Sequence, residues 1–184
     1  MAESNESVKH VPRFMPDRAL PPYAHTPGVT PHPIRDPDGH SSGESHPELP
    51  SPESSAWRDC ELYLRGIDLF NAGYYWEAHE AWEAVWIAAG RRGVHADFFK
   101  ALIKLAAAGV KLREANPAGA RRHLRRADEL LTIVSAAQAV EGSLFGLELE
   151  PLQQACRELV AGTLPDVSNQ REPVPALGIS LVPG

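Results

Sequence analysis

Residues 69–86 read LFNAGYYWEAHEAWEAVW, and this stretch decides the fold. It holds three of the four tryptophans and two of the four tyrosines of the chain. The Asn71-Ala72-Gly73 segment is typical of a turn, because Asn and Gly tolerate a left-handed backbone. No Pro or Gly interrupts residues 75–89, which predicts a helix that ends at Gly90.

The predicted helix has two unlike faces at about 100° per residue. One face mixes aromatic, acidic and imidazole groups, namely Trp76, His79, Glu80, Glu83 and Trp86, together with Ile87. The other face carries small residues that suit close contact with a neighbouring helix: Ala78, Ala81, Val85 and Ala88. Large apolar side chains are usually buried, so the tryptophans should draw the acidic groups inward. Buried charge needs a partner or a bound ion.

Composition predicts one globular domain with tails. The chain has 184 residues, of which 43% are hydrophobic, enough for a core. The formal net charge of −6 argues against nucleic acid as a partner. No signal peptide and no apolar run of about 20 residues is visible, so no membrane contact is expected. Cys60 and Cys156 are far apart, as in proteins of a reducing compartment. These features predict a soluble cytoplasmic protein.

The expected fold class is all-α, a small bundle of about five helices. Hydrophobic periodicity and chain breakers predict helices at residues 56–71, 75–89, 94–115, 118–139 and 151–162. Residues 140–150 are expected to form a loop. The bundle should span residues 56–162, between a Pro- and His-rich segment at 1–55 and a Pro-rich tail at 163–184.

The N-terminal segment admits two interpretations. Its many prolines favour a disordered or polyproline-like tail. Residues 21–40, however, mix Tyr, His, Ile and Arg, and prolines lower the entropic cost of docking. The segment could therefore lie as an extended strap over the helix at 75–89 and bring His32 or His40 to a site there.

The run from residue 61 to about 131 resembles the domain of unknown function 309 family. The opening stretch follows the family pattern Phe-Asn-x-Gly-x-aromatic-x-x-Glu-x-His-Glu-x-x-Glu-x-x-Trp with a slight shift of spacing at Tyr75 and Trp76, and residues 100–108 and 116–120 continue the resemblance. Members often have Gly-Leu-Ile-Gln where this chain has Ala101-Leu102-Ile103-Lys104, so a role for that Gln does not carry over. The resemblance implies a helical bundle with an acidic, histidine-containing centre and no established activity.

The chemistry of the stretch points to a metal site as one hypothesis. His79 and Glu83 are four residues apart on one helical face, and the order His-Glu-x-x-Glu is similar to the His-Glu-x-x-His zinc helix. This donor set suits a divalent ion such as zinc, manganese or iron. His32 or His40 would complete the shell, and Glu80 would act as general base in hydrolase-like chemistry.

Other hypotheses remain open for the same residues. A small-molecule pocket would use Asn71, Tyr75, Trp76 and Trp86 as its walls. A structural interpretation makes the His79 and Glu83 pair a buried hydrogen-bond network that fixes helix packing.

A third hypothesis is a tetratricopeptide-like interaction module, although no clean 34-residue repeat is present. It would expose Trp82 to a partner protein. The Ala- and Gly-rich face of residues 94–115 would suit a homodimer as well as an internal contact.

Overall fold

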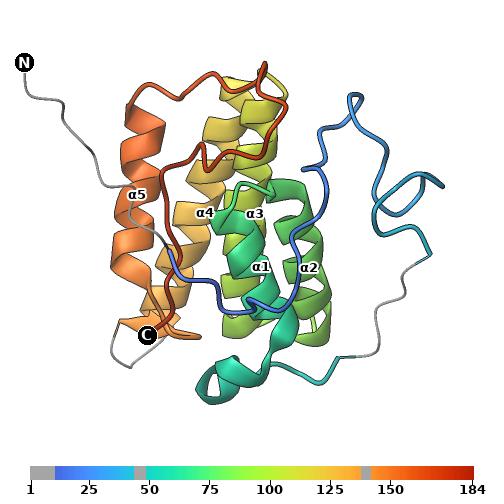
Figure 1. The fold of residues 1–184 in the computed structure, drawn as a ribbon. Helices are drawn as coiled ribbons and strands as arrows, with labels where there is room; N and C mark the ends of the chain where they lie inside the picture. Colours follow the sequence, from blue (N-terminus) through green and yellow to red (C-terminus); the bar gives the residue numbers. More distant parts are fainter. Residues whose placement is uncertain (1–10, 44–48, 138–141) are drawn as a thin grey trace, which may run out of the picture.

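The chain folds as an all-α bundle in a computed structural model that describes residues 11–43, 49–137 and 142–184 (Figure 1). This confirms the fold class expected from the sequence. In the described residues the helices are α1 (Glu61–Asn71), α2 (Tyr75–Ala88), α3 (Val94–Arg113), α4 (Pro117–Ala137) and α5 (Leu149–Ala161), preceded by the 3-10 helix η1 (Ser54–Asp59).

Successive helices pack side by side, so that α2 contacts α1 and α3, and α4 contacts α3 and α5. Two glycines set the distance between α2 and its neighbours. A Cβ atom on Gly66 of α1 would overlap the indole of Trp82, and one on Gly109 of α3 would overlap the ring of Tyr75. The small-residue face of α3 is therefore used inside the chain, where the α2 aromatics lie directly on backbone.

The centre of the bundle is aromatic. Tyr63, Phe98, Phe99 and Phe145 have no exposed surface. The rings of Phe98 and Phe145 stack at a centroid distance of 5.3 Å. The hydroxyl of Tyr63 donates to the carbonyl of Phe145 at 2.7 Å. Burial of each such side chain stabilises the fold by about 1.5–3 kcal/mol, so these contacts fix the hairpin region that carries Phe145 onto the helices.

The first predicted helix begins later than its periodicity suggested. Residues 54–59 form η1, which has a non-helical Ala56 inside it, and α1 starts only at Glu61. Trp57 belongs to η1 and is 6% exposed. Its ring packs edge-on against Tyr63 at 6.4 Å, so its burial needs no continuous helix. The predicted start at residue 56 was wrong for this reason.

The predicted loop at 140–150 contains a small hairpin instead. Strand β1 (Ser143–Leu144) pairs antiparallel with β2 (Leu147–Glu148). The two connecting residues, Phe145 and Gly146, have φ values of 52° and 76°, as two-residue hairpin turns require. Helix α5 then begins at Leu149, two residues earlier than predicted. The predicted end of the fourth helix at residue 139 falls outside the described residues.

Residues 11–43 of the N-terminal segment form a strap that crosses α1 and α2 (Figure 1). The backbone N–H groups of Phe14 and Met15 donate to the carboxylate of Asp68 on α1, at 2.7 and 2.9 Å. The side chain of Asp68 is 1% exposed. These two bonds hold the strap where it first meets the bundle, because an unpaired carboxylate at this depth would be costly.

The C-terminal segment also docks on the bundle. The side-chain amide of Asn71 exchanges two hydrogen bonds with the backbone of Leu181, both at 2.8 Å. The hydroxyl of Tyr75 accepts from the N–H of Leu177 at 3.1 Å. Leu177, Ile179 and Leu181 are buried, whereas Val182 is 52% exposed. Both polar side chains therefore serve as attachment points for the tail.

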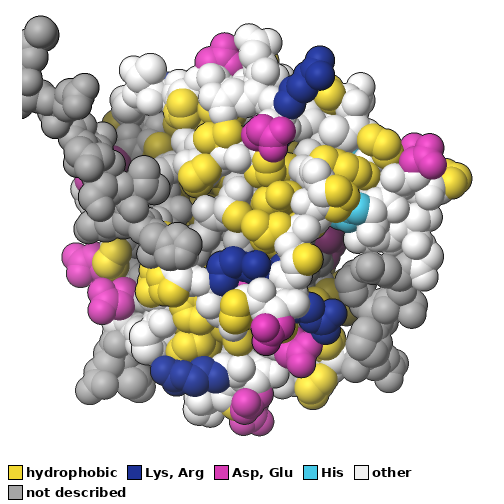
Figure 2. Space-filling view, in the orientation of Figure 1, with side chains coloured by type: hydrophobic (Ala, Val, Ile, Leu, Met, Phe, Trp, Pro, Cys, Tyr) yellow, Lys and Arg dark blue, Asp and Glu magenta, His cyan; other side chains and the backbone are white. Residues whose placement is uncertain are grey.

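Figure 2 shows hydrophobic side chains gathered along the middle of the face where the terminal segments cross the helices, with charged side chains scattered among them. Within the described parts of the chain, none of the helices combines the length and the apolar character that a bilayer crossing demands.

Candidate functional site

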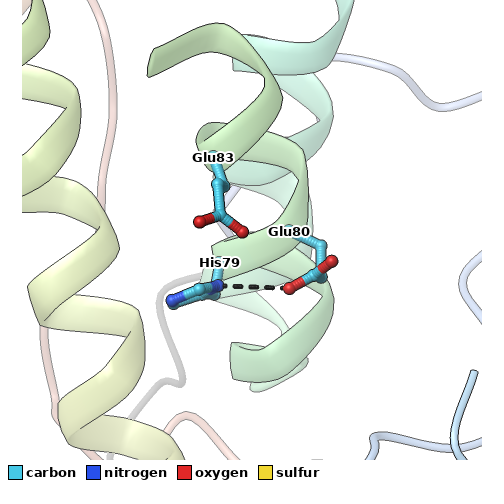
Figure 3. A group of neighbouring side chains, drawn as sticks. All are labelled: His79, Glu80 and Glu83. Atoms are coloured by element: carbon cyan, nitrogen blue, oxygen red, sulfur yellow. Dashed lines mark ion pairs between the residues drawn. The ribbon is translucent and has the colours of Figure 1, made fainter. Parts of the chain in front are cut away.

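His79, Glu80 and Glu83 form a compact group on one turn of α2 (Figure 3). One nitrogen or oxygen donor atom from each of the three residues lies within 4.8 Å of the other two. Nδ1 of His79 is 3.4 Å from Oε1 of Glu80, and the two side chains are 29% and 30% exposed. His79 and Glu83 are an i, i+4 pair and Glu80 and Glu83 are an i, i+3 pair, so helical geometry places both His79 and Glu80 beside Glu83.

The described residues leave a donor atom of this group without a hydrogen-bond partner. Nδ1 of His79 is buried and has no hydrogen-bond partner among the described residues. The 3.4 Å separation from Glu80 is an ion-pair contact only if the imidazole is protonated. One imidazole and two carboxylates suit zinc, manganese or iron. Ligands that come from one partly exposed turn leave coordination positions open, as in catalytic rather than structural metal sites.

The two faces of α2 differ from the sequence prediction. The mixed face is only partly buried, and Ile87 on it is 47% exposed. Trp82 is fully buried, and its indole N–H donates to the carbonyl of Tyr63 at 3.2 Å. A surface role for Trp82 is therefore wrong. The buried position is decided by Gly66, which makes room for the indole on α1.

Glu77 is the functional-looking residue that sequence analysis missed. Its side chain is 5% exposed. Oε1 accepts the backbone N–H of His25 at 2.7 Å and lies 3.2 Å from Nε2 of His40. Oε2 is buried and has no hydrogen-bond partner among the described residues. Both partners come from the strap, so this carboxylate fastens the strap to α2. The sequence signals for it were its place at the edge of the mixed face and the Glu-x-His-Glu of the family pattern.

The strap histidines gather around Trp76 and Glu77 rather than around His79. The ring of His32 lies 5.2 Å from the indole of Trp76, and its Nδ1 accepts backbone N–H groups at 3.3 Å. The ring of His40 also packs against Tyr23 at 4.7 Å. Among the described residues, the metal-compatible group contains His79, Glu80 and Glu83 without either strap histidine. The strap thus reaches α2 without completing a shell there.

Burial lowers the pKa of a strap histidine. The pKa of His25 lies below its usual value, chiefly because burial desolvates the imidazolium. The nearby charge of Glu77 opposes this shift, while the neighbouring imidazoles of His32 and His40 add to it. The ring of His25 lies 5.0 Å from the indole of Trp76, and burial there disfavours its charged form.

A cavity of about 1050 Å³ lies between the strap, η1, α1 and α2. On α2 it is lined by Trp76, Glu77 and Glu80, and the strap contributes Ile34 and His40. Glu80 therefore connects this cavity to the His79 group. The volume is at the upper end of the range found for small-molecule sites.

The remaining predicted wall residues lie elsewhere. Asn71 and Tyr75 hold the C-terminal segment, and burial raises the pKa of Tyr75 to about 12. Trp86 is absent from the described lining of the cavity. Its ring instead lies 5.9 Å from both the Arg91 guanidinium and the Lys100 ammonium group. Of the four predicted wall residues, only Trp76 faces the cavity.

Residues 63–123 match the model of a family described as "Domain of unknown function (DUF309)". The matched range runs from α1 into α4 and contains all of α2, including the His79 group. The strap lies outside it. A search of curated proteins found no match.

Proposed function

We propose that the chain, whose residues 63–123 match the DUF309 family model, binds a divalent metal ion with His79 and Glu83 as ligands and Glu80 beside them. The observation that carries the proposal is the convergence of three donor atoms within 4.8 Å on a single partly exposed turn. The buried Nδ1 of His79, which has no hydrogen-bond partner among the described residues, supports it further.

The donor set suits hydrolase-like chemistry. A divalent ion in such a site acidifies a water molecule in its open coordination positions. With His79 and Glu83 holding such an ion, Glu80, whose carboxylate lies beside His79 and borders the cavity, would serve as general base toward that water. The cavity would then hold the body of the substrate next to the reacting group.

Thermal unfolding of metal-stripped protein tests the proposal. Addition of zinc, manganese or iron(II) should raise the melting temperature of the wild-type chain, because an ion that binds only the folded state stabilises it. The rise should disappear in His79→Ala and in Glu83→Ala. The exposed carboxylate of Glu150, on α5, supplies the matched control Glu150→Ala, which should respond like the wild type. An unchanged wild-type melting temperature with all three ions would overturn the proposal.

The cavity supports a second candidate function, the binding of a small amphipathic molecule. Trp76 gives it an aromatic wall, and Ile34 and the strap prolines give it apolar surface. Glu77, Glu80 and the guanidinium of Arg65 supply a few polar groups, the composition typical of ligand sites.

A fluorescent probe separates this candidate from the metal site. The dye 1-anilinonaphthalene-8-sulfonate should bind metal-free protein with one saturable site and lose it in Trp76→Ala. Trp86→Ala removes an equally large ring outside the described cavity lining and should leave the dye signal intact. Equal loss in both variants, or non-saturating fluorescence in the wild type, would rule out a defined pocket.

A further inference from the structure

A second concave surface lies between α3 and α4, on the bundle and apart from the strap. It is a hollow of about 370 Å³. The described residues that line it are mostly basic: Lys104, Arg122, His123, Arg125, Arg126 and Glu129. Four cations thus surround one carboxylate in a depression of the surface. We call this surface the basic hollow.

Most of the positive charge in the basic hollow is not neutralised by the protein. Arg126 pairs with Glu129 at 2.7 Å. In residues 11–43, 49–137 and 142–184, no carboxylate lies within ion-pair distance of Lys104, Arg122 or Arg125. Cations gathered in a concavity repel one another. A bound anion would reduce this repulsion in the hollow.

The neighbouring Arg121 shows what a structural arginine looks like in the same helix. Its guanidinium donates to the carbonyls of Val160 and Gly162 at the end of α5, at 3.3 and 3.0 Å. No such backbone bond to Arg122 or Arg125 is present in the described residues, and both side chains are exposed. The arginines of α4 therefore divide into one that ties helices together and others that face solvent.

We propose that the basic hollow binds the phosphoryl group of a phosphorylated small molecule. A phosphoryl group carries close to two negative charges and three acceptor oxygens, which matches several cations around one concavity. Arginine guanidinium groups donate two parallel hydrogen bonds to such oxygens, and Lys104 adds a point charge. A carboxylate ligand would offer one charge and two oxygens, and would leave more of the positive charge unmatched.

The cations of the hollow also act on the histidine that lines it. Burial, together with the charges of Lys104, Arg122, Lys111 and His79, lowers the pKa of His123 to about 4. Phosphate binding in the hollow does not depend on the proposed metal site.

Titration of the metal-free, full-length protein with inorganic phosphate at constant ionic strength tests the binding step. Backbone amide shifts should saturate and should concentrate in α3 near Lys104 and in α4 at residues 119–129. The double variant Arg122→Gln/Arg125→Gln should weaken binding at least about tenfold, because charge-assisted hydrogen bonds are the strong ones. The matched control Arg35→Gln/Arg92→Gln removes the same charge from exposed positions elsewhere and should stay within about twofold of wild type.

The outcomes separate the two proposals. Linear, non-saturating shifts, or equal weakening in both double variants, would show only general charge attraction and would overturn the phosphate site. Saturable phosphate binding in a protein that takes up no metal would leave the hollow in place and refute the proposed function.

Discussion

The polar and aromatic side chains on the two sides of α2 differ in their burial and in their hydrogen-bond partners. On the inner side, the indole N–H of Trp82 and one carboxylate oxygen of Glu77 have partners within the chain, and both side chains are buried. On the outer side, His79, Glu80 and Glu83 remain partly exposed with converging donors. Buried polar groups that serve the fold are normally satisfied by the fold. The outer group therefore keeps converging donors that the proposed metal site can use.

The largest difference between the sides should appear when tryptophans are removed. Trp82→Ala empties a fully buried position and should lower the free energy of unfolding by about 3–5 kcal/mol. Trp76→Ala removes a partly exposed ring that faces a cavity and should cost less than half as much. Urea unfolding of both variants measures the difference, and equal losses would show that the two sides are not distinct.

Removal of the strap attachment at Glu77 should have the next largest effect on the free energy of unfolding. Glu77→Ala breaks the bonds to the His25 backbone and the His40 ring, and should lower the free energy of unfolding by about 2–4 kcal/mol. It should also speed hydrogen exchange at the His25 amide, because that amide would lose its acceptor. Slow exchange at His25 in the variant would show that Glu77 does not hold the strap.

Acid should weaken the fold through two histidines whose charged forms are disfavoured by burial in the folded chain. The pKa of His123 is lowered to about 4 and that of His25 is lowered as well, mainly by burial in both cases. The unfolded chain binds protons near pH 6.5 and the folded chain does so only at lower pH, so stability falls as the pH drops from about 6.5 towards 4.

His123→Asn should flatten this decline, because asparagine does not titrate. Unfolding free energies measured by urea at pH 7, 6, 5 and 4.5 give the slope for wild type and variant. Identical slopes would contradict the burial assigned to His123.

The smallest stability effect is expected on the outer side. Without metal, Glu83→Gln should change the free energy of unfolding by no more than about 0.5 kcal/mol, as is usual for partly exposed positions outside the packed core. A loss as large as that of Glu77→Ala would mean that Glu83 belongs to a structural network and would favour the packing hypothesis for the His79 group.

Sequence periodicity was sufficient to predict the all-α fold class. It also predicted the start of α2 at Tyr75, because the segment between Gly73 and Gly90 contains no chain breaker. It was also sufficient to group His79, Glu80 and Glu83, whose proximity follows from one helical turn. These features depend only on residues close in sequence. Local patterns can therefore predict them.

Features that depend on distant residues could not be predicted in the same way. The burial of Trp82 instead of Trp76 is decided by Gly66 on another helix. The role of Glu77 is decided by strap residues 37 and 52 positions away in the chain. The helical wheel shows that two faces differ, but it does not show which face meets the neighbours.

The most direct test of the central claim is the metal content of the chain purified without an affinity tag, measured by elemental analysis. We expect close to one zinc, manganese or iron ion per chain in the wild type and in His40→Ala, since His40 lies with Glu77, and almost none in His79→Ala. Metal-free wild-type protein that still takes up no ion on dialysis against zinc, manganese or iron(II), or equal metal content in the wild type and His79→Ala, would contradict the assignment of a metal site to His79, Glu80 and Glu83.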